Sequence, residues 1–411
     1  MRSARCFGSD KDIPCLNLVG SAAWYAKGCC ASAHLFRATT VNGIPVTAFV
    51  TITKREGMFM LGYENELKKI YVELTLKCNL NCRTCFRHNW GIPLVDMDMR
   101  TVLRVYEGLK DFKKVEEVVF GGIGEPTIHP RFSEIVRLFD GGYKRVLTTN
   151  AFYWSETTLD TIVQNFDRVI VSVDGMTDTF KEIRGFDFSI LEGNLRRLAD
   201  RKRELGRKRP LVQAQLVLST SNVEEVQDLI PVLHRMGVMK LIVSNLLPQN
   251  IDGKDMITYT LDRNAFMREK RNQWLQTCLG NQMQLKVANI ELKTERRCTF
   301  IEDGTTLITA DGNVAPCYRF AHPGVEYIFG RRKQVRPWYF GNINSESLGR
   351  IWDKPKYFDL RIQNYSNRFP SCPDCDLVDC CDYISDSDCD CKGQYPSCGD
   401  CLWTRGFVEC V

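Results

Sequence analysis

The sequence predicts an α/β fold, a partial (β/α)6 TIM-like barrel, preceded by a small β-rich segment and followed by a cysteine-rich domain. Three observations predict it. Between residues 69 and 245, short apolar runs alternate six times with helical patterns. The stretch from residue 86 to 277 contains no cysteine, whereas nine of the chain's nineteen cysteines lie in its last forty residues. That last region is rich in Gly, Pro and Asp and cannot build a large apolar core. We therefore expect three parts, at residues 1–68, 69–295 and 296–411.

Each part carries its own local signals. In the first, Asn42-Gly43 suits a type I′ hairpin turn, with strands expected at residues 46–53 and 58–63. In the second, strands are expected at residues 70–76, 115–120, 145–148, 168–173, 211–218 and 241–243. Helices are expected at residues 99–112, 132–139, 157–166 and 223–236, and another has one face marked by Leu191, Leu195, Leu198 and Leu205. Repeated β–α units imply parallel strands, with functional residues on the loops after the strand ends.

Charge and hydropathy argue against several classes of function. The 411 residues carry a formal net charge of +5, and the densest basic run, residues 201–209, ends a helical pattern. Because Lys and Arg favour helix C-termini, this run indicates a solvated helix end rather than a nucleic-acid site. No apolar stretch reaches the length of a membrane helix, and the N-terminus shows no signal-peptide pattern. We expect a cytoplasmic protein with neither a nucleic-acid nor a membrane partner.

The number of cysteines is unusual for such a protein. Disulfides are rare in a reducing compartment, so abundant cysteine there points to metal or redox chemistry. Cys78, Cys82 and Cys85 form a Cys-x3-Cys-x2-Cys pattern directly after the first expected strand. Three thiolates are one fewer than a [4Fe–4S] cluster usually takes, which leaves one iron open to a small molecule. The alternative is a structural zinc site with His88 as its fourth ligand.

This motif at this place resembles the radical S-adenosylmethionine (SAM) superfamily. The resemblance implies that Cys78, Cys82 and Cys85 hold a catalytic [4Fe–4S] cluster whose open iron binds SAM. It further implies that SAM is cleaved reductively to a 5′-deoxyadenosyl radical, which abstracts hydrogen from a substrate. The later strand ends are then expected to form the SAM pocket, where the alternative for the glycine segment is a plain turn. The expected pocket residues are Gly121, Gly122, Gly124, Glu125, Asn150, Ser172, Asp174 and Arg184.

The last part resembles a SPASM extension, which binds one or two auxiliary [4Fe–4S] clusters. Cys298 is followed by the Gly-x4-Cys pattern of Gly312 and Cys317. The resemblance implies one cluster held by Cys298, Cys317 and a later cysteine, and another held by Cys372, Cys375 and either Cys380 or Cys381. Further ligands are expected among Cys391, Cys398, Cys401 and Cys410. A zinc ribbon is the alternative, because Cys-x2-Cys pairs also bind zinc.

A narrower resemblance concerns the substrate. The segments 85–90, 121–126 and 129–132 and the tail 396–403 are similar to maturases of tungsten-cofactor oxidoreductases. The resemblance implies a protein, peptide or metallopterin substrate and an electron donor such as ferredoxin or flavodoxin. Two other functions stay open: a SPASM-type enzyme that modifies a ribosomally made peptide, and a non-catalytic zinc-binding interaction protein. Tyr318 stands where sulfatase maturases carry Asp, which argues against sulfatase maturation. His88 and His129 are expected to be structural rather than catalytic.

Overall fold

The computed structural model describes residues 64–410, so the hairpin expected at residues 46–53 and 58–63 lies outside the described residues. Within this range one sheet contains ten strands, in the order β12-β9-β8-β1-β2-β3-β4-β5-β6-β7. The eight strands from β8 to β7 are parallel neighbours, and β9 and β12 join antiparallel at the β8 side. The sheet therefore forms a barrel that stays open between its two edge strands. This confirms the predicted partial-barrel fold class.

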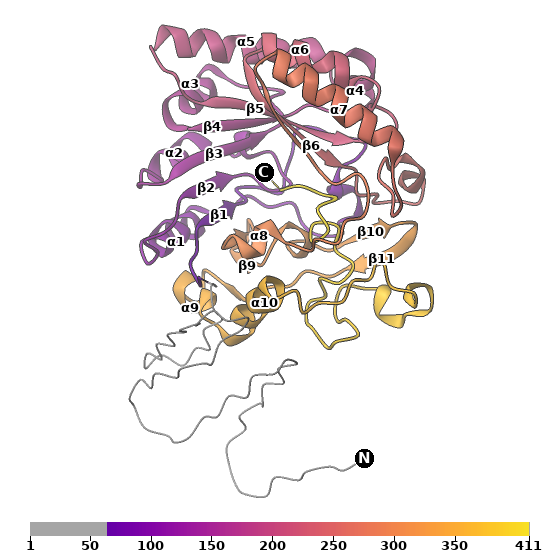
Figure 1. The fold of residues 1–411 in the computed structure, drawn as a ribbon. Coiled ribbons are helices and arrows are strands. Elements are labelled where there is room, and N and C mark those ends of the chain that lie inside the picture. The colour runs from indigo at the N-terminus through magenta and orange to yellow at the C-terminus, as the bar shows by residue number, and fades with distance from the viewer. Residues whose placement is uncertain (1–63, 411) are drawn as a thin grey trace, which may run out of the picture. The chain divides into compact units, whose positions relative to one another are not determined.

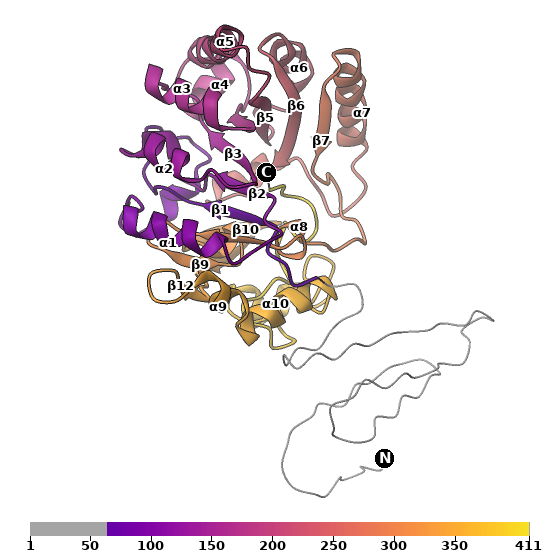
Figure 2. The ribbon, with the colours of Figure 1, turned by 90° about the vertical axis from the view of Figure 1, so that its left-hand side faces the viewer.

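The strand and helix bounds follow the predicted alternation closely. The parallel strands of the core are β1 (Lys69–Val72), β2 (Glu117–Phe120), β3 (Lys144–Thr149), β4 (Arg168–Ser172), β5 (Leu211–Leu218), β6 (Val238–Asn245) and β7 (Gln284–Val287). The helices that alternate with them are α1 (Met99–Leu109), α2 (Phe132–Leu138), α3 (Glu156–Asn165), α4 (Thr177–Arg184), α5 (Phe188–Glu204), α6 (Val226–Arg235) and α7 (Ala265–Gly280). In Figures 1 and 2 these helices lie on the outer face of the sheet, which leaves the inner face for a site.

Local chemistry explains several of these boundaries. The side chain of Asp98 accepts a hydrogen bond from Thr101 N at the start of α1, and Ser155 caps α3 in the same way. Gly185 ends α4 with a φ of 84°, a conformation that glycine adopts without strain. The first strand is shorter than expected because Leu74 and Leu76 exchange backbone hydrogen bonds with the segment at residues 95–97 instead of the sheet.

The last part of the chain extends the barrel and then wraps back over it. Its elements are α8 (Thr299–Glu302), β8 (Thr305–Ile308), β9 (Asn313–Ala315), β10 (Gly324–Ile328), β11 (Arg331–Val335), β12 (Gly341–Asn342), α9 (Leu348–Trp352) and α10 (Pro355–Tyr365). Strands β10 and β11 form a separate antiparallel hairpin. The tail then runs in among the core strands, where Asn245 donates to Phe407 O and Glu409 N donates to Ser244 Oγ. The C-terminal region therefore forms part of the barrel interior.

Candidate active site and cysteine centres

A cavity of about 290 Å³ lies at the carboxyl ends of the strands. Its wall comes from the loop after β1, the glycine segment after β2, the ends of β3, β4, β5 and β6, and the segments around His322 and Trp403. The structure brings nearly all of the expected core site residues to this cavity: Cys78, Cys82, Cys85, Gly122, Gly124, Glu125, Asn150, Ser172, Asp174 and Arg184. Gly121 lies beside them but does not line the cavity.

The three-cysteine loop is fixed by hydrogen bonds to its sulfurs. Cys78 Sγ accepts from Leu80 N at 3.4 Å and from Asn150 Nδ2 at 3.6 Å. Arg184 Nη1 donates to Cys82 Sγ at 3.8 Å. Burial raises the pKa of both thiols, whereas these donors and the guanidinium favour the thiolate. Three thiols on one loop beside a cation and a cavity fit a cluster that carries its own positive charge and leaves one position open.

The glycines after β2 are required by protein packing. A Cβ on Gly121 would meet Thr148 Oγ1 at 2.1 Å, and one on Gly124 would meet Thr75 O at 2.0 Å. Gly122 has a φ of +141° and lies against Glu73. These glycines were expected as part of the SAM pocket, and in the structure they let this loop lie against β3 and the segment that follows β1. Gly122 and Gly124 thereby come to line the cavity.

Glu125 is buried and heavily hydrogen-bonded. Its Oε1 accepts from Thr149 Oγ1 at 2.8 Å and from both the backbone and the hydroxyl of Thr127. Its Oε2 accepts from Asn150 N at 2.7 Å. Burial raises the pKa of this carboxyl, and the four donors oppose that effect. Within residues 64–410, Oε2 accepts from Asn150 N alone, so it is the oxygen better able to accept a ligand's ammonium.

Asp174 and Arg184 form a buried ion pair beside the cluster loop. Arg184 Nε lies 2.6 Å from Asp174 Oδ2, and the two side chains are 14% and 1% exposed. The second oxygen of Asp174 accepts from Val217 N at 2.7 Å. One edge of the Arg184 guanidinium therefore contacts Asp174, and another faces the sulfur of Cys82. Ser172, two residues earlier on β4, also lines the cavity.

The two histidines singled out in the sequence have structural partners. His88 Nε2 lies 2.8 Å from the carbonyl of Cys82, within the loop itself. His129 Nε2 lies 3.1 Å from Met97 O, and its Nδ1 accepts from Arg131 N. Neither geometry is that of a zinc ligand. Among the described residues, no group of three or more His, Cys, Asp or Glu side chains is arranged around a single metal ion.

Sequence reasoning missed a buried His–Glu pair at this cavity. His322 lines the cavity, and its Nε2 lies 2.7 Å from Oε2 of Glu73, the residue after β1. The Trp90 ring packs on the imidazole with 4.3 Å between ring centroids. The position of Glu73 at the end of the first strand was the one sequence signal for this pair. His322 follows no strand of the core, so nothing in the sequence was a reason to place it at the site. The pair places a titratable group beside the cluster loop.

The later cysteines form two groups. Auxiliary centre 1 is a small cavity lined by Cys298, Cys317, Cys398, Cys401 and Cys410. Burial raises the pKa of every one of these thiols, that of Cys317 to about 12. Neighbouring sulfurs raise the pKa further for all of them except Cys401, where Glu326 has that effect. Thiols held so close together become thiolates only when a bound metal supplies positive charge, which fits an iron–sulfur cluster. Five cysteines exceed the four ligands of one such cluster.

Auxiliary centre 2 lies nearer the surface. Burial raises the pKa of Cys372 to about 12, and the charges of Cys391 and Cys381 act in the same direction. Cys375 belongs to the same turn, since its N donates to Cys372 O. We define this centre as Cys372, Cys375, Cys381 and Cys391. Cys389 instead bonds to Asp390 O, and the Cys278 thiol is buried on α7 away from both centres.

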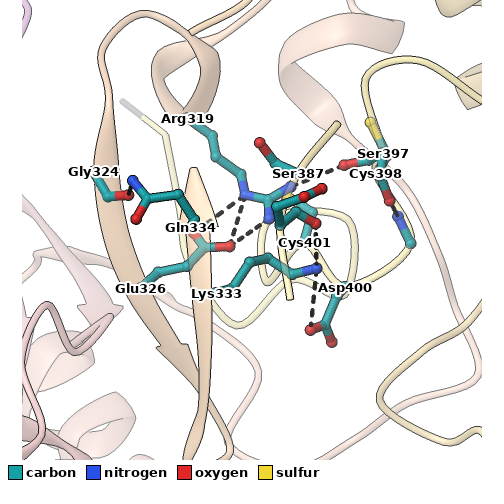
Figure 3. A network of polar contacts seen from close by, with 12 residues as sticks. Arg319, Gly324, Glu326, Lys333, Gln334, Ser387, Ser397, Cys398, Asp400 and Cys401 are labelled. Atoms are coloured by element: carbon teal, nitrogen blue, oxygen red, sulfur yellow. Dashed lines mark hydrogen bonds and ion pairs between the residues drawn. The ribbon is translucent and has the colours of Figure 1, made fainter. Parts of the chain in front are cut away.

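Buried charges connect the β10–β11 hairpin to auxiliary centre 1, as Figure 3 shows. Arg319 Nε donates to Glu326 Oε1 at 3.0 Å, and the two side chains are 2% and 3% exposed. Arg319 also donates to Ser397 O, next to Cys398. Lys333 lies 3.9 Å from Asp400, which stands between the two cysteines of the tail Cys-x2-Cys. The network ties the β10–β11 hairpin to auxiliary centre 1, and Cys372 N of auxiliary centre 2 donates to Gly399 O in the same tail segment.

Comparison with known proteins agrees with this architecture. Residues 72–238 match the radical SAM superfamily, and residues 298–376 match the SPASM iron–sulfur cluster-binding domain. The chain is 35% identical over 352 residues to the tungsten-containing aldehyde ferredoxin oxidoreductase cofactor-modifying protein of Pyrococcus furiosus, covering 84% of this chain and 97% of that relative. The chain belongs to the radical SAM/SPASM family. This confirms the resemblance that the cysteine patterns indicated.

Other relatives of this radical SAM/SPASM enzyme are more distant. It is 25% identical over 276 residues to a probable GTP 3′,8-cyclase of Methanococcus aeolicus, covering 62% of this chain and 86% of that one. The crystal structure of Streptococcus suis SuiB gives a TM-score of 0.55 at 16% identity, covering 72% of this chain and 68% of that one. The native structure of anSMEcpe with bound AdoMet gives a TM-score of 0.53 at 16% identity, covering 82% of this chain and 95% of that one. These structures support the fold.

Family membership implies a bound SAM and iron–sulfur clusters for this radical SAM/SPASM enzyme. Its own residues supply the shape of the site: a cysteine loop, a cavity beside it and buried charges that hold both. In the part of the chain that the structure describes, no helix is long and apolar enough to cross a membrane.

Proposed function

We propose that this enzyme is a maturase that modifies the cofactor of a tungsten-containing aldehyde oxidoreductase. The observation that carries the proposal is the 35% identity to a protein named for that role, which extends over 97% of that relative. The cysteine loop and the cavity beside it support it, because they supply three thiols for a cluster and a space for SAM at the strand ends, as this chemistry requires. A low-potential donor of the ferredoxin or flavodoxin class would supply the electrons.

In this proposal the core residues hold SAM and one cluster. Cys78, Cys82 and Cys85 are the cluster ligands. When bound, the cluster supplies the electron that cleaves SAM and so produces the 5′-deoxyadenosyl radical that abstracts hydrogen. Glu125 accepts the SAM ammonium, and Arg184 keeps its positive charge beside Cys82. The remaining wall residues Gly122, Gly124, Asn150, Ser172 and Asp174 orient the nucleoside and exclude water.

We further propose two auxiliary clusters, one in each auxiliary centre. The five cysteines of auxiliary centre 1 include Cys398 and Cys401, and auxiliary centre 2 includes Cys391. This assignment of cysteines to two clusters is supported by the two separate groups that their sulfurs form. With three four-iron clusters the reconstituted protein should hold about twelve iron atoms per chain.

Anaerobic reconstitution followed by dithionite-driven turnover tests the core of the proposal. We expect SAM to yield 5′-deoxyadenosine, and the triple substitution Cys78→Ala, Cys82→Ala, Cys85→Ala to abolish that product while about eight irons remain. The matched control is Cys278→Ala, which removes a buried thiol outside all three centres and should keep both the product and the iron. Persistent SAM cleavage in the triple variant, or zinc in place of iron, would refute the assignment.

The substrate needs a second experiment. An aldehyde oxidoreductase produced in cells that lack this enzyme should carry an unmodified cofactor and regain activity when the wild-type enzyme, SAM and reductant are added. The triple cysteine variant should give no recovery. If the oxidoreductase is fully active without this enzyme while 5′-deoxyadenosine still forms, the radical chemistry stands and the tungsten-cofactor substrate is wrong. A peptide substrate would then be the next hypothesis to test.

A further inference from the structure

The barrel contains a second cavity, of about 370 Å³, at the amino ends of its strands. Inward-facing residues alternate with outward-facing ones along a strand, so one strand can contribute to both cavities, as β4, β5 and β6 do. On β4, Arg168 and Ile170 line the second cavity and Ser172 the first; on β5, Gln213 lines the second and Gln215 the first. Among the described residues, Cys410 alone lines both cavities, so the C-terminal tail divides the barrel interior.

The lining of this amino-end cavity is strongly basic. The inner layers of such barrels are usually filled by branched apolar side chains. Here five basic and three acidic side chains line the cavity: Lys68, Lys69, Arg168, Lys240, Lys286, Glu116, Glu117 and Asp303. An excess of positive charge inside the barrel, at the amino ends of the strands, therefore requires an explanation.

The ion pairs of the cavity reduce this excess without removing it. Lys68 pairs with Glu64, which lies outside the lining, at 3.3 Å. Glu117 is shared, because its Oε2 lies 2.9 Å from Arg168 Nη2 and 3.6 Å from Lys69 Nζ. Lys286 reaches Glu409 of the tail at 2.5 Å. The Lys240 ammonium makes no hydrogen bond or ion pair with any of residues 64–410. Burial lowers the pKa of Lys240, the charges of Lys286 and Arg168 lower it further, and the charge of Glu409 opposes this shift.

Two buried donors in the same cavity also lack partners. Tyr71 is fully buried, and its ring packs against Phe300 and Tyr318. Within the described part of the chain, neither its hydroxyl nor the buried Arg168 Nε has a hydrogen-bond partner. Buried donors that bond to nothing are costly, so such groups in a native protein usually meet a ligand or a water molecule. Water would satisfy the donors but would leave the positive excess uncompensated.

We propose that the amino-end cavity binds a tetrahedral oxyanion of the phosphate type, free or as the phosphate group of a small molecule. Arg168 is its central residue, because Lys69, Tyr71 and Lys240 all surround it. Its guanidinium, the Lys240 ammonium and the Tyr71 hydroxyl supply hydrogen bonds to the oxygens, and the lysines supply the charge. The site is independent of the proposed maturation reaction and lies on the other side of the tail from the cluster loop.

Isothermal titration calorimetry on the reconstituted full-length enzyme, in buffer without phosphate or sulfate, tests this site. The probes are inorganic phosphate and ribose 5-phosphate. We expect saturable binding that Lys240→Met weakens at least roughly tenfold. The matched control is Lys356→Met, which removes the same charge from the exposed side of α10 and should leave the affinity unchanged. Tighter binding of the ester would identify a phosphorylated molecule as the source, and equal binding a free oxyanion.

Iron content and 5′-deoxyadenosine formation check that each variant is folded, since Lys240 lies outside the cluster cavity. If Lys240→Met does not fold, Arg168→Lys serves the same purpose, because it keeps the charge and removes the unpartnered Nε. The absence of saturable binding to either probe would overturn the proposal. So would equal affinities of Lys240→Met and Lys356→Met, because phosphate would then bind elsewhere.

Discussion

The imidazole of His322 lies 2.7 Å from the carboxylate of Glu73, between Nε2 and Oε2, although the two residues are 249 positions apart in the sequence. Both side chains are buried, at 5% and 1% exposure. Oε1 of Glu73 accepts from Ile123 N at 3.0 Å, within the glycine segment of the cavity. The pair thus links the C-terminal region to the first core strand and to the expected SAM pocket.

This pair predicts a specific stability effect. His322→Phe keeps a ring against Trp90 but removes the donor to Glu73, so we expect a loss of about 1–3 kcal/mol of unfolding free energy. His322→Gln keeps a donor and should lose less. A double-mutant cycle with Glu73→Gln, followed by thermal unfolding under anaerobic conditions, measures the coupling between the two side chains. Additive effects of the two substitutions would contradict a direct interaction.

Much of the barrel could be predicted from the sequence, because its strands are short apolar runs with turns between them. The strand at residues 211–218 was predicted with the bounds that β5 has. Helix α7 was missed, because Phe266 and Leu279 are exposed and its apolar residues form no single stripe. Helix α4 was also missed, because eight mostly polar residues give a weak pattern.

The candidate site was predictable only where it is local in sequence. The cysteine loop and the strand-end residues follow from spacing, so they could be named in advance. The grouping of Cys398 with Cys298 depends on how the tail folds back, and spacing does not determine such a pairing. The same holds for His322, whose partner Glu73 follows a distant strand, and for the charged cavity at the amino ends, whose lining comes from seven strands.

The glycine segment predicts a strong contrast between two Gly→Ala substitutions. A Cβ on Gly124 would stand 2.0 Å from the carbonyl oxygen of Thr75, which is backbone and cannot move aside. We expect Gly124→Ala to destabilise the enzyme by more than about 3 kcal/mol and to reduce SAM binding. Gly193 on α5 has nothing within 4 Å of its Cβ position, so Gly193→Ala should stabilise by about 0.5–1 kcal/mol. Thermal midpoints measured side by side check both, and equal midpoints would refute the packing argument.

The buried pair of Asp174 and Arg184 should respond to charge removal. Asp174→Asn can still accept from Val217 N but leaves the guanidinium without its counter-charge, so we expect a loss of about 3–5 kcal/mol. The matched control is Asp187→Asn, which breaks the exposed pair with Lys181 at the end of the same helix and should lose nothing measurable. Chemical denaturation of both variants tests this. Equal losses would show that burial of the Asp174 pair has no special effect.

For the buried pair of Arg319 and Glu326, removing both charges should be less destabilising than removing one. Arg319→Met leaves the Glu326 carboxylate unpaired in the interior, at an expected loss of about 3–5 kcal/mol. The double variant Arg319→Met, Glu326→Leu removes both charges and should recover most of that loss. Thermal unfolding and iron content of the single and double variants measure it. A double variant as unstable as the single one would mean that the hydrogen bond from Arg319 to Ser397 O, rather than the ion pair, holds the tail.

The hydrogen bonds of His129 predict a pH dependence of stability. Nδ1 accepts from Arg131 N, so Nε2 must carry the proton that it donates to Met97 O, and the ring is bound in its neutral form. Burial lowers the pKa of His129; Met97 O and Asp96 oppose this shift, and Lys77 and Arg131 add to it.

Because the pKa of His129 is lower in the folded state, the unfolded chain binds more protons near and below its ordinary value of about 6.5. The stability from this residue is therefore fully present above that pH and is lost as pH falls through the lowered pKa of the folded state. We expect the thermal midpoint of the wild type to fall between pH 7.5 and pH 5.5 more steeply than that of His129→Gln, which cannot be protonated in this range. Parallel pH profiles of the two proteins would show that this imidazole titrates equally in the folded and unfolded states.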